Sequence, residues 1–153
     1  MLNIFSRVLA VVVAILSALT LGEYVGFSVG SALCEAKDPM VGGVWASDLD
    51  SYIYFSNNQR FIFFFLIIYL VCKLFPNNIF LRLPGLLFLF LSLYFEWRII
   101  HFKGLFWDVT NKYLRLGQEM FIFDALIIII IITLIVIEII LTVRHFWPKK
   151  VRG

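Results

Sequence analysis

Four long apolar stretches alternate with shorter polar stretches along this chain of 153 residues. A helix needs about 20 apolar residues to cross the hydrocarbon layer of a bilayer, and each stretch is close to that length. We therefore predict an all-α, polytopic membrane protein whose four transmembrane helices pack as a small bundle, one membrane domain over residues 1–153. The predicted spans cover 2–22 (with an extension of this helix to about 33 left open), 58–75, 79–97 and 120–143.

The polar stretches divide the chain into loops of different character. We expect an outer loop over 23–57, an inner turn over 76–78, an outer interfacial segment over 98–119 and a basic tail over 144–153. Asp38-Pro39 and Gly42-Gly43 are turn signals within the first loop. The connection between the second and third spans is short, so these two helices are expected to be antiparallel neighbours.

Composition supports the membrane class and excludes most others. The chain is 62% hydrophobic and only 15% charged, whereas soluble domains average about 45–50% and 25%. The net charge of +3 does not indicate nucleic-acid binding, because the basic residues flank apolar spans, where such residues orient a membrane protein. The expected partners are the lipid bilayer and another membrane protein or a second copy of this chain.

Charge also predicts the orientation. Arg7, Lys73 and Arg82 place basic residues at the N-terminus and at the inner turn, and the tail after Val143 is strongly basic. The first long loop is acidic, although the second carries four bases against two acids and argues weakly the other way. By the positive-inside rule, both termini are expected in the cytoplasm, with the protein in the cell inner membrane. The first apolar stretch resembles a signal peptide but lacks a small-residue cleavage site, so we expect it to stay as a helix.

A row of small residues recurs at every fourth position of the first span. Its members are Ser6, Ala10, Ala14, Ala18, Gly22, Gly26, Gly30 and Cys34. Small side chains at this spacing let two helices approach closely in lipid, so we interpret Ala10 to Gly30 as a helix-packing groove. The alternative is that small residues are simply common in membrane helices. We expect an internal contact for Ala10 to Ala18 and an external or loop contact for Gly26 and Gly30.

Two acids of the fourth span are the main candidates for chemistry. Asp124 and Glu138 are 14 residues apart, which places them about 21 Å apart on one helix face. Intramembrane acids usually face a partner or a cavity. One interpretation is an ion or proton path along that face. The other, which we favour, is structural pairing, with Arg7 or Lys73 for Glu138 and with Arg60 or Arg98 for Asp124.

The remaining reactive residues do not form a recognisable catalytic motif. Cys34 and Cys72 are expected at opposite depths and therefore cannot form a disulfide. HExxH, GxSxG, CxxC and phosphate-loop motifs are absent from the sequence, so we expect no enzyme activity and no cofactor. Glu96, His101 and Asp108 are a possible metal group, but a polar surface loop is the preferred interpretation.

These observations favour a non-enzymatic membrane protein that acts through helix packing, as an accessory subunit or an immunity or exclusion factor. The predicted topology resembles that of bacterial immunity proteins against pore-forming toxins, which is an analogy of topology only. The alternative function is a small oligomeric ion or proton transporter or channel that uses Asp124 and Glu138.

Overall fold

The described part of the chain folds into four α-helices and contains no β-strand, as expected. The structure is a computed structural model that describes residues 1–37, 42–75, 78–105 and 116–146, with side chains for 1–26, 54–75, 78, 80–101 and 122–146. The helices are α1 (Leu2–Lys37), α2 (Gly42–Lys73), α3 (Ile79–Leu105) and α5 (Leu116–Phe146).

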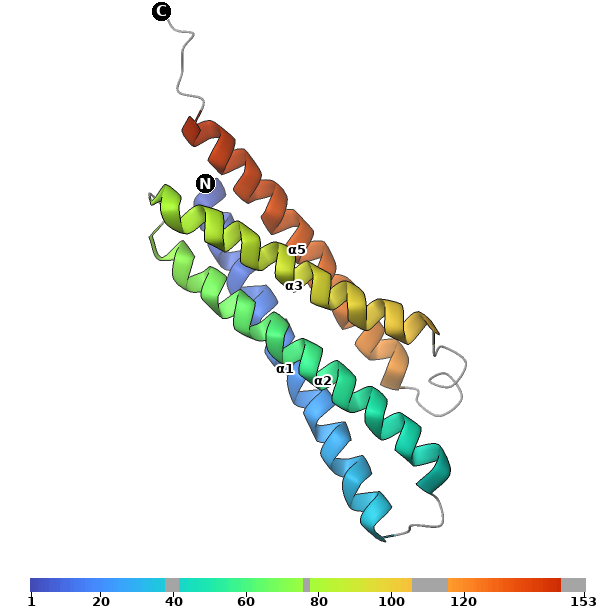
Figure 1. Ribbon diagram of the computed structural model, residues 1–153. Helices are drawn as coiled ribbons and strands as arrows, with labels where there is room; N and C mark the ends of the chain where they lie inside the picture. Colours follow the sequence, from blue (N-terminus) through green and yellow to red (C-terminus); the bar gives the residue numbers. More distant parts are fainter. Residues whose placement is uncertain (38–41, 76–77, 106–115, 147–153) are drawn as a thin grey trace, which may run out of the picture.

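The helices form a four-membered ring in which each helix packs on two others. The order around the ring is α1, α2, α3, α5, and α5 closes it by contacting α1. Figure 1 shows that the start of α1, the turn between α2 and α3 and the end of α5 lie at one end of the bundle. We call this the turn end, and the opposite end, where α3 finishes and α5 begins, the loop end.

Each helix contains a segment long and apolar enough to span a membrane. The segments are Leu2–Gly26, Tyr54–Lys73, Phe80–His101 and Ile122–Phe146. The outer surface of the bundle is also apolar, with large exposed side chains such as Ile15, Phe64, Leu87 and Ile129. Monomeric soluble proteins rarely expose such extensive apolar surface. The protein is therefore a multi-pass membrane protein.

The helices are longer than hydropathy predicted. The segment 23–57, expected as a loop, is helical up to Lys37 and again from Gly42, and Figure 1 shows this pair of helices projecting past α3 and α5. The segment 98–119 likewise begins as a continuation of α3 to Leu105. Hydropathy reports where apolar side chains end, whereas backbone hydrogen bonding continues into polar sequence. The turn signal Asp38-Pro39 lies outside the described residues.

Asn78 caps α3 directly before its first residue, Ile79, in the tight turn after α2. Its side-chain Oδ1 accepts a hydrogen bond from the backbone N–H of Phe80 at 3.0 Å, and its carbonyl accepts from Leu81 and Arg82. Asparagine is a preferred residue at this position, because its side chain satisfies an N–H that has no partner within the helix. Since α2 ends at Lys73, the connection is short and the two helices are antiparallel neighbours.

The middle of the bundle is an apolar core to which every helix contributes. Val13, Leu66, Leu89 and Ile131, one from each helix, are all fully buried. Phenylalanine rings add to the α2–α3 interface, where Phe61 and Phe95 lie with centroids 5.1 Å apart and Phe65 and Phe88 5.7 Å apart. The core thus separates whatever polar groups lie near the two ends of the bundle.

Candidate functional site: two buried polar clusters

The two acids singled out in the sequence both point into the bundle. Asp124 is fully buried and Glu138 is almost so. Glu138 lies near the turn end of α5 and Asp124 near its loop end, about 21 Å apart along the helix. Each acid belongs to a separate cluster of buried polar side chains.

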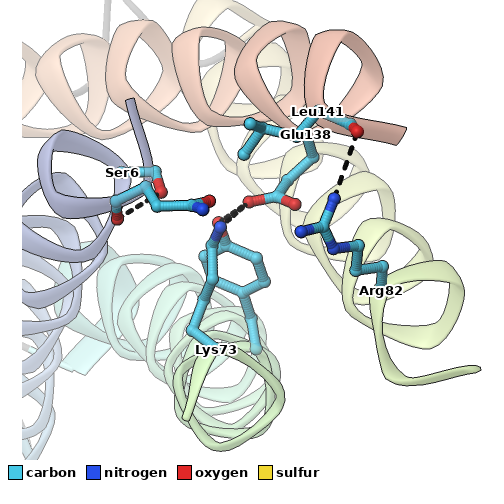
Figure 2. Close-up of polar contacts among 7 residues, drawn as sticks. Ser6, Lys73, Arg82, Glu138 and Leu141 are labelled. Carbon is cyan, nitrogen blue, oxygen red and sulfur yellow. Dashed lines mark hydrogen bonds and ion pairs between the residues drawn. The ribbon is translucent and has the colours of Figure 1, made fainter. Parts of the chain in front are cut away.

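The Glu138 cluster, made of Glu138, Lys73 and Tyr69, joins α5 to α2. The Lys73 ammonium forms an ion pair with Glu138 Oε1, and the Tyr69 hydroxyl donates a hydrogen bond to the same oxygen at 2.9 Å. Figure 2 shows Lys73 directed at the Glu138 carboxylate. Lys73 is one of the two partners that the sequence analysis named for Glu138. The other, Arg7, is exposed.

Arg82 ties α3 to the same end of α5. Its Nη1 donates a hydrogen bond to the backbone carbonyl of Leu141 at 3.1 Å (Figure 2). This carbonyl belongs to the last two turns of α5, which ends at Phe146. Basic groups near a helix C-terminus interact favourably with the helix dipole. Side chains of α2 and α3 therefore both hold the turn end of α5.

The Asp124 cluster, made of Asp124, Tyr24 and Glu96, joins α5, α1 and α3 at the loop end. The Tyr24 hydroxyl donates to the Asp124 carboxylate, with distances of 2.9 Å to Oδ2 and 3.2 Å to Oδ1. Glu96 of α3 is fully buried and lies within electrostatic range of Tyr24. The Tyr24 ring packs on Phe55 of α2, with centroids 5.4 Å apart. The hydrogen bonds and the ring contact of Tyr24 thus connect α1 with α5 and α2.

Neither base proposed for Asp124 is needed to explain its burial. Arg60 is exposed. Arg98 donates from Nε to the Tyr54 hydroxyl at 3.2 Å, and its guanidinium lies over the rings of Tyr54 and Phe95. The hydrogen-bond partner of Asp124 is instead Tyr24, which the sequence analysis did not identify because the two residues are 100 positions apart.

Gln59 forms a smaller polar contact between α2 and α1. Its Nε2 donates to Ser17 Oγ at 2.9 Å, and both side chains are fully buried. Its Oε1 is buried without a hydrogen-bond partner among the described residues. Each hydrogen bond of this kind stabilises the association of membrane helices by about 0.6–2 kcal/mol.

The buried face of α5 between the two acids is apolar. Its members are Ile127, Ile131, Leu134, Ile135 and Ile137. Leu66 of α2 and Leu89 of α3 fill the same region of the core. A proton or ion path needs polar groups or water along its length. In this conformation, the described residues on the buried face of α5 provide no polar group between the two clusters.

The small-residue row of α1 turns from the inside of the bundle to the outside. Ala10 and Ala14 are buried, whereas Ala18, Gly22 and Gly26 are exposed. A Cβ atom added at Gly22 or Gly26 would meet nothing within 4 Å. Because a helix has 3.6 residues per turn, a row at every fourth residue rotates by about 40° per step. The expected internal contact therefore ends before Ala18, and Gly30 lies outside the residues with described side chains.

Among the three glycines whose surroundings the structure describes, Gly85 is the one that lies against a neighbouring helix. A Cβ atom added at Gly85 of α3 would lie 3.4 Å from Cys72 Cβ and 3.4 Å from Tyr69 Cδ2, both on α2. The absence of a side chain at Gly85 thus brings α2 and α3 together. Sequence reasoning missed Gly85 because an isolated glycine shows no periodicity.

The metal group considered for Glu96, His101 and Asp108 does not assemble within the described residues. Glu96 is fully buried, whereas His101 is exposed and stacks on Trp97. No group of three or more metal-ligating side chains occurs in the described part of the chain. Asp108 and the side chain of Cys34 lie outside it, and Cys72 is a free, half-buried thiol.

Comparison of the chain with protein-family models, with curated proteins and with solved structures finds no match. The arrangement of side chains is therefore the basis for the functional argument.

Proposed function

We propose that this protein is a non-enzymatic interaction protein of the cell inner membrane, with both termini in the cytoplasm. It packs α1 against another membrane protein, as an accessory subunit or an immunity or exclusion factor. The observation that carries this proposal is the exposed part of the small-residue row, Ala18, Gly22 and Gly26. Small residues at this spacing on an outer face let a second helix approach backbone to backbone.

The state of the buried acids also supports a structural role for the bundle interior. Glu138 is neutralised by Lys73 and Asp124 accepts hydrogen bonds from Tyr24. Burying a charge in a membrane is costly unless it is paired, so these contacts explain why the acids are tolerated there. An interaction protein requires only that they hold the bundle together.

Photo-crosslinking inside the membrane tests the proposed interaction. A photoreactive amino acid is placed at Leu19 or Glu23, exposed positions directly beside Ala18 and Gly22 that already carry larger side chains, and at the control position Val8, which is exposed nearer the N-terminus of α1. We expect one discrete crosslinked protein from Leu19 and Glu23 and none from Val8, and Gly22→Leu should remove the crosslinks made at Leu19 and Glu23. Equal crosslinking at all three positions, or none at any, would contradict the proposal.

The alternative function, an oligomeric ion or proton transporter, is supported by the burial of three carboxylates, Glu96, Asp124 and Glu138. Reconstitution in liposomes with a pH-sensitive dye distinguishes the two functions. The interaction protein gives no flux above that of empty liposomes. The transporter gives flux that the double variant Asp124→Asn, Glu138→Gln abolishes while the protein stays assembled.

A further inference from the structure

An apolar groove runs between α3 and α5 on the outside of the bundle. Its volume is about 620 Å³, within the range of ligand sites, about 300–1,000 Å³. The side chains that matter for the argument are Phe90, Tyr94, Trp97 and Ile100 of α3 with Ala125 and Ile129 of α5. None of the residues that line it is charged.

The groove occupies the loop-end half of the bundle. From Phe90 to Ile100 it covers ten residue steps of α3, or about 15 Å, and the α3 segment that can span a membrane is Phe80–His101. This length is about half of the ~30 Å hydrocarbon layer. An acyl chain from one leaflet is that long, whereas a transmembrane partner helix would need a groove through both leaflets.

Two basic side chains of α3, Arg98 and His101, lie beside aromatic residues that line the groove. The Arg98 guanidinium lies 6.0 Å from the ring centroid of Tyr94, and the His101 ring stacks on Trp97 with centroids 6.2 Å apart. Tyr94 and Trp97 both line the groove. Arginine binds phosphate through a planar fork of N–H donors, so the charge beside the groove complements an anionic headgroup.

We propose that the α3–α5 groove binds an anionic phospholipid of the leaflet at the loop end. One acyl chain lies along Phe90, Trp97 and Ile129, and the phosphate lies beside Arg98 and His101. Tyrosine and tryptophan at the entrance suit the boundary between hydrocarbon and headgroups. This site is separate from the exposed face of α1 and does not depend on the proposed function.

Fluorescence quenching at Trp97 tests the site directly. Trp45, Trp107 and Trp147 are replaced by Phe, which leaves Trp97 as the only tryptophan. The protein in bilayers of phosphatidylcholine then receives small fractions of phosphatidylglycerol with brominated acyl chains. We expect saturable quenching at a lipid fraction roughly fivefold lower than for brominated phosphatidylcholine, the effect of one basic side chain at an anionic surface.

Matched variants separate a bound lipid from the lipid that surrounds any membrane protein. Ala125→Phe fills the groove and should remove the saturable quenching, whereas Ile139→Phe, at an exposed position of α5 outside it, should not. Arg98→Gln should lose the preference for phosphatidylglycerol and Arg98→Lys should keep most of it, which a purely structural role of Arg98 would not predict. Circular dichroism and gel filtration confirm that each variant is folded.

Two outcomes overturn the proposal. One is quenching in simple proportion to the lipid fraction and equal for the two lipids, which means surrounding lipid only. The other is an oligomer that Ala125→Phe dissociates while the quenching is unchanged, which means that a second copy occupies the groove.

Discussion

At the scale of single residues, the polar groups of this protein are placed opposite to those of a soluble protein. Lys73, Glu96, Asp124 and Glu138 are buried, and the exposed surface of the spans is largely apolar. Water is absent from the surroundings of the spans, so polar side chains need partners within the protein. Thr20 and Ser92 bond to backbone carbonyls of their own helix, whereas the buried carboxylates of Asp124 and Glu138 bond to side chains of other helices. Residues such as Tyr24 and Tyr69 matter because their hydroxyls reach a buried carboxylate.

The Lys73–Glu138 ion pair should dominate the stability of the turn end. Glu138→Gln or Lys73→Met each leaves one buried group without its partner, and we expect a loss of unfolding free energy of about 3–5 kcal/mol. The double variant should lose less than either single variant, because no charge remains unpaired. Reversible unfolding in mixed detergents measures these changes.

Arg7→Gln is the control for this cycle, since Arg7 is exposed and its removal should be nearly neutral. If the double variant loses as much unfolding free energy as the two single variants together, Lys73 and Glu138 do not stabilise each other, and the prediction is wrong.

Gly85 should tolerate bulk far less well than the exposed glycines of α1. Gly85→Leu places a side chain where Cys72 and Tyr69 already lie 3.4 Å from an added Cβ atom. We expect overpacking to reduce the unfolding free energy by about 1–3 kcal/mol, measured as above. Gly22→Leu is the matched control and should leave monomer stability nearly unchanged. Equal effects of the two changes would contradict the structural distinction between these glycines.

At the scale of the elements, α1 has a buried face and an exposed face that share one row of small residues. The buried face carries Ala10, Val13, Ser17 and Tyr24. The row crosses from one face to the other between Ala14 and Ala18, because its spacing of four exceeds the 3.6 residues of a turn.

Leucine substitutions one step apart on this row should therefore have opposite effects. Ala14→Leu forces bulk into the contact inside the bundle and should lower the unfolding free energy by about 1–3 kcal/mol. Ala18→Leu points outward and should leave the monomer stable while weakening the crosslink expected at Leu19. Thermal unfolding in mild detergent and the crosslinking yield measure the two effects. A stable Ala14→Leu protein together with an unfolded Ala18→Leu protein would reverse the assignment of faces.

At the scale of the whole molecule, the N-terminus, the α2–α3 turn and the end of α5 share one end of the bundle (Figure 1). An even number of spans places the two termini on the same side of the membrane, whichever side that is. The acidic first loop and the basic residues Arg7, Lys73 and Arg82 favour the turn end on the cytoplasmic side.

Reporter fusions test this orientation. A reporter that is active only outside the cytoplasm should be active after Val41 or Val109 and silent after Asn78 or Gly153. The fusion after Val109 is the most informative, because the second outer stretch carries four bases against two acids. Activity after Gly153 would contradict cytoplasmic termini.

The sequence by itself determined the class of fold, because the need to satisfy every backbone hydrogen bond in lipid leaves a long apolar run such as Leu126–Ile132 no alternative to a helix. It also predicted four spans, in agreement with the four helices that are long and apolar enough to cross a membrane, and offered Lys73 as a partner for Glu138. The first helix, for which an extension to about residue 33 was left open, runs to Lys37, and α2 begins earlier than expected, at Gly42. Hydropathy falls where side chains become polar, but the helix continues.

Only the tertiary structure decided which side chains meet. Tyr24 and Asp124 are 100 positions apart, and Gly85 faces Tyr69 only because α2 and α3 are antiparallel. The division of the small-residue row at Ala18 likewise depends on where α2 and α5 lie around α1. The local pattern of a sequence records the period of a helix, whereas the register and rotation of each helix against its neighbours arise from packing.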